Sequence, residues 1–154
     1  MDNLDTQVLT AARCWAAEGH RFALVTVART WGSAPRPPGA WMVLRDDGQV
    51  QGSVSGGCIE DDLIRRALDG EFAEGGPRVL RYGVTADEAH RFGLPCGGTL
   101  ELLLEPAPDA ALLDQLAARV GRGQLARRRV SLATGGVVVE DGTAGDAQQW
   151  DGET

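Results

Sequence analysis

Apolar positions recur along the first part of the chain with two different spacings. From residue 4 to residue 18 they return every three or four positions, and Gly19 follows, which predicts an amphipathic helix that ends at a glycine. Residues 22–30 are rich in β-branched side chains and almost wholly apolar on both faces, as in a central strand that is covered on both sides. A helix followed by a buried strand is therefore expected at the start of the fold.

The rest of the chain continues with both patterns. After Cys58, apolar residues keep helical spacing, with acidic side chains first and arginines later, which matches the dipole of a helix that reaches Leu68. The other predicted elements are a hairpin of 41–44 and 49–54, strands at 78–82 and 100–104, helices at 85–92 and 109–120, and a late strand or hairpin from 130–132 and 137–139. This order predicts a mixed α/β fold: a single domain over residues 1–142 with a mixed β-sheet flanked by helices, then a disordered tail at 143–154.

Composition narrows the class of protein. A chain of 154 residues can bury a core without disulfides or a structural metal. Its 15 basic and 22 acidic side chains give a net charge of −7, the wrong sign for a phosphate backbone, so we expect no nucleic-acid partner. No apolar run approaches the roughly 20 residues of a membrane span, and the N-terminus lacks the pattern of a secretory signal. We therefore expect a cytoplasmic protein, whose three cysteines are free thiols.

Two of the cysteines lie beside paired glycines at predicted junctions between elements. Paired glycines let backbone amides approach a ligand closely and leave a neighbouring thiol unshielded. Cys14, inside the first predicted helix, is instead expected to be a small packing residue. The candidate ligand-binding or metal-binding residues are Cys58 with Gly56 and Gly57, and Cys96 with Gly97 and Gly98.

At the start of its predicted helix, Cys58 would lie at the positive end of the helix dipole, which favours the thiolate. The acidic residues Glu60, Asp61 and Asp62 oppose this effect unless their carboxylates point to solvent. The alternative for Cys58 is a buried small residue after a tight turn. If the strands bring Cys96 to the same edge of the sheet, the two thiols and nearby amides would form a concave site for an anionic or thiophilic ligand.

The segment of residues 31–40 contains three prolines, which stiffen it and exclude a helix. Arg36 lies between two of them, so its guanidinium would lose little entropy on clamping phosphate or another oxyanion. The alternative is a surface arginine stacked on a flanking tryptophan, with Ser33 closing a local turn.

Four sequence blocks together resemble the N-terminal domain of a known family. They are residues 29–40 (RTWGSAPRPPGA), 52–60 (GSVSGGCIE), 80–83 (LRYG) and 93–98 (GLPCGG). Their order and separations are similar to those of the XdhC/CoxI family, the accessory factors that mature xanthine dehydrogenase and related molybdenum hydroxylases. The combination of blocks, more than any single block, makes the resemblance specific.

The resemblance implies a chaperone that binds the molybdenum cofactor, a pyranopterin phosphate. Such a protein protects the cofactor while its terminal sulfur is installed and inserts it into the apo-hydroxylase. Carried over by position, the resemblance implies cofactor contact for Cys58 and Cys96, including contact of either sulfur with molybdenum. The other motif positions implied as cofactor-binding are Ser33, Arg36, Gly56, Gly57, Gly97 and Gly98.

Family members typically continue into a second, Rossmann-like domain, whereas no G-x-G-x-x-G dinucleotide-binding unit occurs in this sequence. We therefore expect the N-terminal domain only, either as a stand-alone protein or as the first domain alone. A separate Rossmann-domain family member or self-association would then complete the pocket. The other expected partners are a molybdenum hydroxylase apo-enzyme and a cysteine desulfurase that supplies sulfur.

The chaperone role implies cofactor binding more than an enzymatic activity of the protein on its own. Two other functions stay open beside it. In the first, Cys58 or Cys96 accepts a persulfide and the protein acts as a sulfur transferase on the cofactor. In the second, the protein is a structural subunit that bridges a maturation complex without binding cofactor. Reactive thiols would favour the first, and a solvent-excluded pair of cysteine loops would favour the second.

Overall fold

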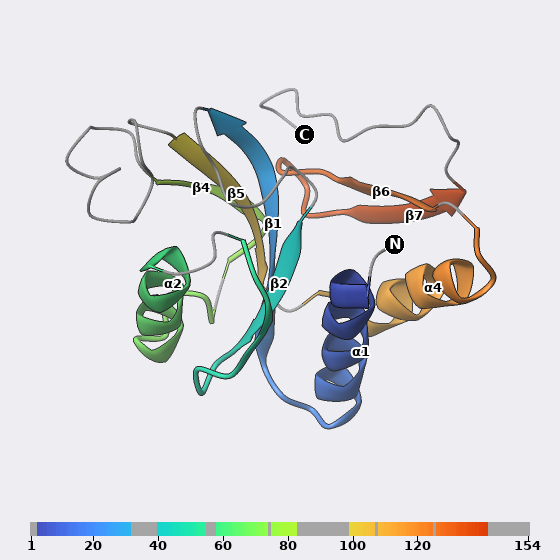
Figure 1. Ribbon diagram of the computed structural model, residues 1–154, viewed down its shortest axis with the longest axis horizontal. Coiled ribbons are helices and arrows are strands. Elements are labelled where there is room, and N and C mark those ends of the chain that lie inside the picture. The colour runs from blue at the N-terminus through green and yellow to red at the C-terminus, as the bar shows by residue number, and fades with distance from the viewer. Residues whose placement is uncertain are drawn as a thin grey trace.

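A five-stranded sheet forms the centre of the protein in the computed structural model (Figure 1). The structure describes residues 3–31, 40–54, 58–73, 75–82, 99–106, 108–124 and 126–141. The strands of the sheet are β1 (Phe22–Trp31), β2 (Trp41–Arg45), β3 (Val50–Gly52), β4 (Arg78–Tyr82) and β5 (Thr99–Pro106), in the order β3-β2-β1-β5-β4. Neighbouring strands are antiparallel throughout. β1 lies at the centre, as its apolar pattern on both faces predicts.

Helices cover both faces of this sheet. α2 (Cys58–Leu68) lies on one face, and α1 (Asn3–Ala17) and α4 (Ala110–Gly121) lie together on the other (Figure 1). A separate antiparallel pair, β6 (Ala126–Val130) and β7 (Val137–Asp141), packs against α4. The predicted mixed α/β fold with helices flanking a sheet is therefore confirmed, and its described strands pair only in antiparallel fashion.

The alternation of side chains along β1 divides the core into two clusters. Ala23, Val25 and Val27 belong to the cluster under α2, which also contains the fully buried Ile59 and Leu63 of that helix. The intervening Phe22 and Leu24 face the other way and pack with residues of α1 and α4. Full burial of a large aliphatic side chain contributes roughly 1.5–3 kcal/mol to the free energy of folding. Burial of β1 side chains on both faces therefore stabilises β1 at the centre of the sheet.

Gly52 ends β3 at the point where the strand passes close to α1. Its φ is +91°, and a Cβ atom there would lie 2.4 Å from Val8 Cγ2 and 2.6 Å from the carbonyl oxygen of Trp41. L-residues other than glycine rarely adopt this φ, and neither contact distance allows a carbon atom. Glycine at this position therefore permits both the backbone turn and the close packing of β3 on α1 and β2.

Polar contacts fix α4 and the β6–β7 pair. The Asp109 side chain caps α4 by accepting a hydrogen bond of 2.8 Å from the Ala111 amide. On β6, Arg128 donates two hydrogen bonds to Glu105 of β5, one of them at 2.8 Å. Since Glu105 is 3% exposed and Arg128 is 15% exposed, this partly buried ion pair ties the small sheet to the large one.

Most predicted elements within the described residues are confirmed, with ends shifted by a few positions. β3 is shorter than predicted, because it ends at Gly52 and does not reach the first glycine pair. The predicted helix at 85–92 and the predicted tail at 143–154 lie outside the described residues, so the division into a domain and a tail stays a prediction.

The expectation that Cys14 is a packing residue is wrong, because its side chain is exposed. The buried face of α1 is formed by Val8, Leu9 and Ala12. Cys14 is two positions after Ala12, about 200° around the helix axis, which turns it towards solvent.

Candidate functional site

The segments that carry the predicted motifs are bounded by residues at one end of the sheet. β1 ends at Trp31 and β5 begins at Thr99, and these two residues pair across the strands. β4 ends at Tyr82, which pairs with Leu100 of β5. Residues 32–39 follow Trp31, and residues 83–98 connect Tyr82 to Thr99. Because Trp31, Tyr82 and Thr99 lie at the same end of β1, β4 and β5, both segments are attached to the sheet at this end (Figure 1).

The remaining motif boundaries lie at the same end. β2 begins at Trp41, and β3 ends at Gly52, which pairs with Met42. The antiparallel order places the start of β2 and the end of β3 on the side where β1 ends. The chain then reaches α2, whose first residue is Cys58. The backbone thus gathers the attachment points of three motif segments, far apart in sequence, at one end of the fold.

The predicted site residues themselves are placed only in part. Cys58 is the first residue of α2, as the sequence predicts, and its side chain lies outside the description. The other predicted cofactor-binding residues lie outside the described residues: Ser33, Arg36, Gly56, Gly57, Cys96, Gly97 and Gly98. Their convergence, and any contact of Cys58 or Cys96 with a metal, therefore stay predictions.

Glu60, in the first turn of α2, closes the connection from β3 to the helix. Its Oε1 accepts hydrogen bonds from Ser53 Oγ at 2.9 Å and from the Val54 amide at 2.8 Å. A carboxylate at this position also interacts favourably with the positive end of the helix dipole. Glu60 therefore joins residues on the two sides of the first glycine pair, because Ser53 and Val54 precede the pair and Glu60 follows it.

Asp62, one turn further along α2, is also engaged. It accepts hydrogen bonds from Tyr82 Oη at 2.7 Å and from Arg65 at 2.6 Å. Burial alone would raise the pKa of Asp62, but these two hydrogen bonds outweigh it, so the pKa is lowered and the group stays ionised. The sequence favours a Cys58 thiolate only if the carboxylates of Glu60, Asp61 and Asp62 point to solvent. Of these three residues, only Asp61 is exposed.

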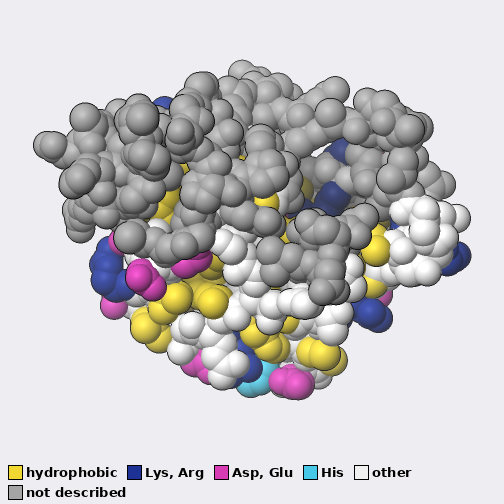
Figure 2. Space-filling model, viewed as in Figure 1, with side chains coloured by type: hydrophobic (Ala, Val, Ile, Leu, Met, Phe, Trp, Pro, Cys, Tyr) yellow, Lys and Arg dark blue, Asp and Glu magenta, His cyan; other side chains and the backbone are white. Residues whose placement is uncertain are grey.

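Tyr82 connects the end of β4 to α2. Its hydroxyl donates to Asp62 and accepts a hydrogen bond of 2.9 Å from Arg66 Nη1. Arg66 in turn makes two hydrogen bonds to Glu71, at 2.9 and 2.5 Å. Burial and the hydrogen bond to Asp62 raise the pKa of Tyr82, so its hydroxyl remains a donor. On this side of the molecule acidic and basic side chains lie next to one another (Figure 2).

The sequence predicts no role for the Tyr82 hydroxyl, and it predicts Asp62 only as a charge that matches the helix dipole and opposes a Cys58 thiolate. Tyr82 belongs to the block at 80–83, which was used for family resemblance alone. A tyrosine at the end of a strand whose alternate residues are apolar was a usable signal, because a buried hydroxyl needs a hydrogen-bond partner.

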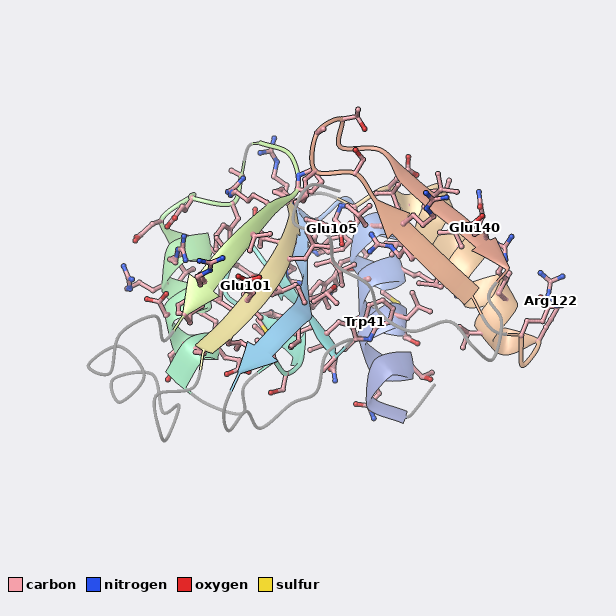
Figure 3. The ribbon with its side chains drawn as sticks, turned by 90° about the horizontal axis from the view of Figure 1, so that it is seen from above. Trp41, Glu101, Glu105, Arg122 and Glu140 are labelled. Atoms are coloured by element: carbon pink, nitrogen blue, oxygen red, sulfur yellow. The ribbon has the colours of Figure 1, made fainter. Side chains whose placement is uncertain are left out.

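Two further carboxylates are buried on the face of β5 that points away from α2. Glu101 and Glu105 lie along this strand (Figure 3) and are 2% and 3% exposed. Arg81 of β4 pairs with Glu101 at 2.5 Å, and Arg128 pairs with Glu105. Each buried carboxylate thus has an arginine partner, which indicates a structural role for both.

Within the described part of the chain, no group of three or more histidine, cysteine or acidic residues is arranged to hold a metal ion. None of the described helices combines the length and the apolar character that crossing a membrane requires.

Comparison with known proteins shows which family the chain is similar to. Residues 15–83 match the model of the XdhC and CoxI family. This span contains Cys58 and the first three of the four motif blocks. The resemblance predicted from the motifs is therefore confirmed: residues 15–83 are similar to the XdhC and CoxI family.

Two proteins of Escherichia coli (strain K12) are similar to the chain. The molybdenum cofactor insertion chaperone PaoD is 40% identical over 105 residues, which cover 66% of this chain and 32% of PaoD. The uncharacterized protein YqeB is 30% identical over 83 residues, which cover 54% of this chain and 15% of YqeB. The chain thus spans a third or less of the length of these relatives.

A solved structure from Bacillus halodurans, described as a xanthine dehydrogenase, has a similar fold. The TM-score is 0.66 at 24% sequence identity, and the match covers 91% of this chain and 46% of the other. At this identity the likeness shows the fold alone.

Proposed function

We propose that this protein is a chaperone of the molybdenum cofactor, which it binds and delivers to a molybdenum hydroxylase such as a xanthine dehydrogenase. The observation that carries the proposal is the 40% identity to PaoD, a molybdenum cofactor insertion chaperone, together with the family match at residues 15–83. The fold supports it, because the motif segments are attached at one end of the sheet.

The residue types of the predicted motifs fit the cofactor. A pyranopterin phosphate offers anionic oxygens, and molybdenum is a metal for which sulfur is a suitable ligand. Cys58 begins an α-helix of 11 residues, whose first amides have no partner within the helix and suit an anionic group. In the proposal, Cys58 and Cys96 contact the metal end, and Arg36 with Ser33 and the paired glycines binds the oxyanions.

The proposed partners follow from this role. A molybdenum hydroxylase apo-enzyme receives the cofactor in the cytoplasm, and a cysteine desulfurase supplies the terminal sulfur. A separate Rossmann-domain family member or a second copy of the chain is also proposed as a partner that completes the pocket.

Cofactor retention tests the proposal directly. The full chain is purified without oxygen from a host that makes the cofactor, and the fluorescent pterin oxidation product is quantified per mole of protein. Cys58→Ala and Cys96→Ala should each reduce the yield at least fivefold, whereas Cys14→Ala, which removes the exposed thiol of α1, should retain it. Equal yields from all three variants and the unmodified chain would contradict the proposed site.

Sulfur transfer is a second candidate function. The observation that favours it is the place of Cys58 as the first residue of α2, because the positive end of a helix dipole favours the thiolate that acts as the nucleophile in sulfur transfer. Incubation with a cysteine desulfurase and cysteine, followed by mass spectrometry, should show one extra sulfur atom on Cys58. A persulfide found equally on Cys14 would indicate unselective chemistry and would remove this candidate.

A further inference from the structure

Arg81 lies on the edge strand β4, in the sequence block at 80–83, to which the proposed function assigns no contact. Its side chain is 60% exposed, yet its Nη2 is 2.5 Å from Oε1 of Glu101, whose side chain is 2% exposed. The pair therefore joins a buried carboxylate to a guanidinium that remains in water. Burial of a carboxylate is costly, and water screens its attraction to an exposed partner.

The second buried carboxylate of β5 is paired in a different way. Arg128 donates two hydrogen bonds to Glu105, and its side chain is only 15% exposed. In Figure 3 Glu105 lies beside the β6–β7 pair, whereas Glu101 lies away from it. Arg128 thus attaches the small sheet, but Arg81 joins β4 to β5, two strands that already pair along their length. A structural role alone does not explain why the Arg81 guanidinium is held in solvent.

The ion pair restricts the guanidinium of Arg81 and leaves donors for a ligand. Within the described ranges, the polar contact of this side chain is the ion pair through Nη2. A guanidinium has five N–H donors in a planar fork, which suits the oxygens of a phosphate group. Because Glu101 already limits the rotamers of Arg81, binding of an anion costs little further side-chain entropy. Arg81 is therefore a preorganised donor for an oxyanion.

Arg81 also lies at the end of the sheet where the motif segments are attached. It precedes Tyr82, the last residue of β4, and its register partner Glu101 is two residues, or about 7 Å, along β5 from Thr99. The register places Arg29 of β1 opposite Glu101 on the other side. This row across β1, β5 and β4 thus carries two arginines and one glutamate, in a chain whose net charge is −7.

We propose that Arg81 is a binding residue for a phosphate monoester, the group that the molybdenum cofactor carries, and that Glu101 holds its guanidinium in place. The identity of the ligand rests on the proposed function, but the phosphate contact can be tested without the cofactor. The phosphate oxygens accept hydrogen bonds from the N–H groups of Arg81 that Glu101 does not engage. Since the guanidinium is exposed, added salt should weaken the contact.

Phosphorus NMR of phenyl phosphate, titrated with the full chain at fixed ionic strength, measures the contact. Arg81→Gln should weaken binding at least fivefold. Arg65→Gln is the matched control, because the Arg65 side chain is 63% exposed and lies 2.6 Å from a carboxylate oxygen of Asp62, and it should change the dissociation constant less than twofold. Equal weakening in the two variants would indicate a response to net charge alone. Binding of inorganic phosphate without binding of phenyl phosphate would reject a monoester as the ligand.

Loss of the contact must be separated from loss of the fold. Arg81→Gln leaves Glu101 buried without its partner and should lower the melting temperature. The double variant Arg81→Gln with Glu101→Gln removes both charges, so it should recover most of the melting temperature while phenyl phosphate binding stays at least fivefold weaker. Recovery of binding together with stability, or unchanged binding in Arg81→Gln, would overturn the proposal.

Pterin retention in the same preparations separates this inference from the proposed function. Arg81→Gln and the double variant should each lower the pterin yield at least threefold. If the unmodified chain retains pterin and both variants retain as much, the role of Arg81 fails and the chaperone function stands. If the unmodified chain binds phenyl phosphate through Arg81 but retains no pterin, the chaperone function fails and the phosphate contact stands.

Discussion

Replacement of Gly52 by alanine tests the close approach of β3 to α1 and β2. The added Cβ would lie 2.4 Å from Val8 Cγ2, 2.6 Å from the Trp41 carbonyl oxygen and 3.1 Å from Met42 Cα. The valine methyl group can move by a small rotation, but two of the three atoms belong to the backbone of β2. The strand pair must therefore separate, or Gly52 must leave its present conformation.

The cost has two parts. An L-residue at the φ of +91° found here is strained by about 1–2 kcal/mol. Overpacking of a dense interior adds about 1–3 kcal/mol, so the expected loss is about 2–5 kcal/mol. Since domains are stable by only about 5–15 kcal/mol, such a loss takes a large part of the free energy of unfolding.

Urea-induced unfolding followed by circular dichroism measures the loss, with the slope of the transition as a check on two-state behaviour. Gly70→Ala is the matched control, because Gly70 has a φ of +80° but a Cβ atom added there would meet nothing within 4 Å. The control should show the backbone strain alone. If Gly52→Ala costs no more than Gly70→Ala, the close packing described for β3 is refuted.

Two other outcomes are expected. Arg128→Ala leaves the buried Glu105 without its ion-pair partner and should lower the free energy of unfolding by about 3–5 kcal/mol. Arg129→Ala, at a side chain that is 72% exposed, should change the free energy of unfolding by less than about 0.5 kcal/mol. Equal losses in the two variants would contradict the role of the Arg128–Glu105 pair. Hydrogen bonds from Arg45 lower the pKa of Asp47 to about 2, so the stability that Asp47 contributes is present above its ordinary value of 3.8 and is lost as the pH falls through about 2. In an NMR titration Arg45→Ala should return the Asp47 pKa towards 3.8, and an unchanged value would refute this assignment.

Local sequence pattern was sufficient to predict most elements. The apolar residues on both faces of residues 22–30 indicated a central strand, and β1 is that strand. The acidic start and basic end after Cys58 predicted α2 with its first residue in place. Such signals are local, because they depend on the period of apolar residues and on the helix dipole.

The long-range pairings were not predictable in the same way. Register between β1 and β5 joins Trp31 with Thr99, and no local pattern specifies a partner so far along the chain. Glu101 would be assigned to solvent by its charge, yet it is 2% exposed because Arg81 supplies the compensating charge. The contact of Tyr82 with Asp62 likewise depends on where the strand and the helix meet in space.

The candidate site could be predicted as a set of residue types and as a family motif. Its backbone frame follows only from the sheet order, which gathers the attachment points at one end. The placement of the two thiols relative to one another is a long-range property, which no local pattern of residues specifies.

The order of the central strands also bears on how the protein folds during synthesis. β1 can pair with β2 as soon as residues 22–45 have emerged, but its other edge waits for β5, which begins at Thr99. Until then a long, apolar strand has one edge free to pair with other chains, and closing so long a loop slows folding. Translation at about 5–20 residues per second leaves that edge open for several seconds, so early chaperone contact on the ribosome is expected to raise the yield of native protein.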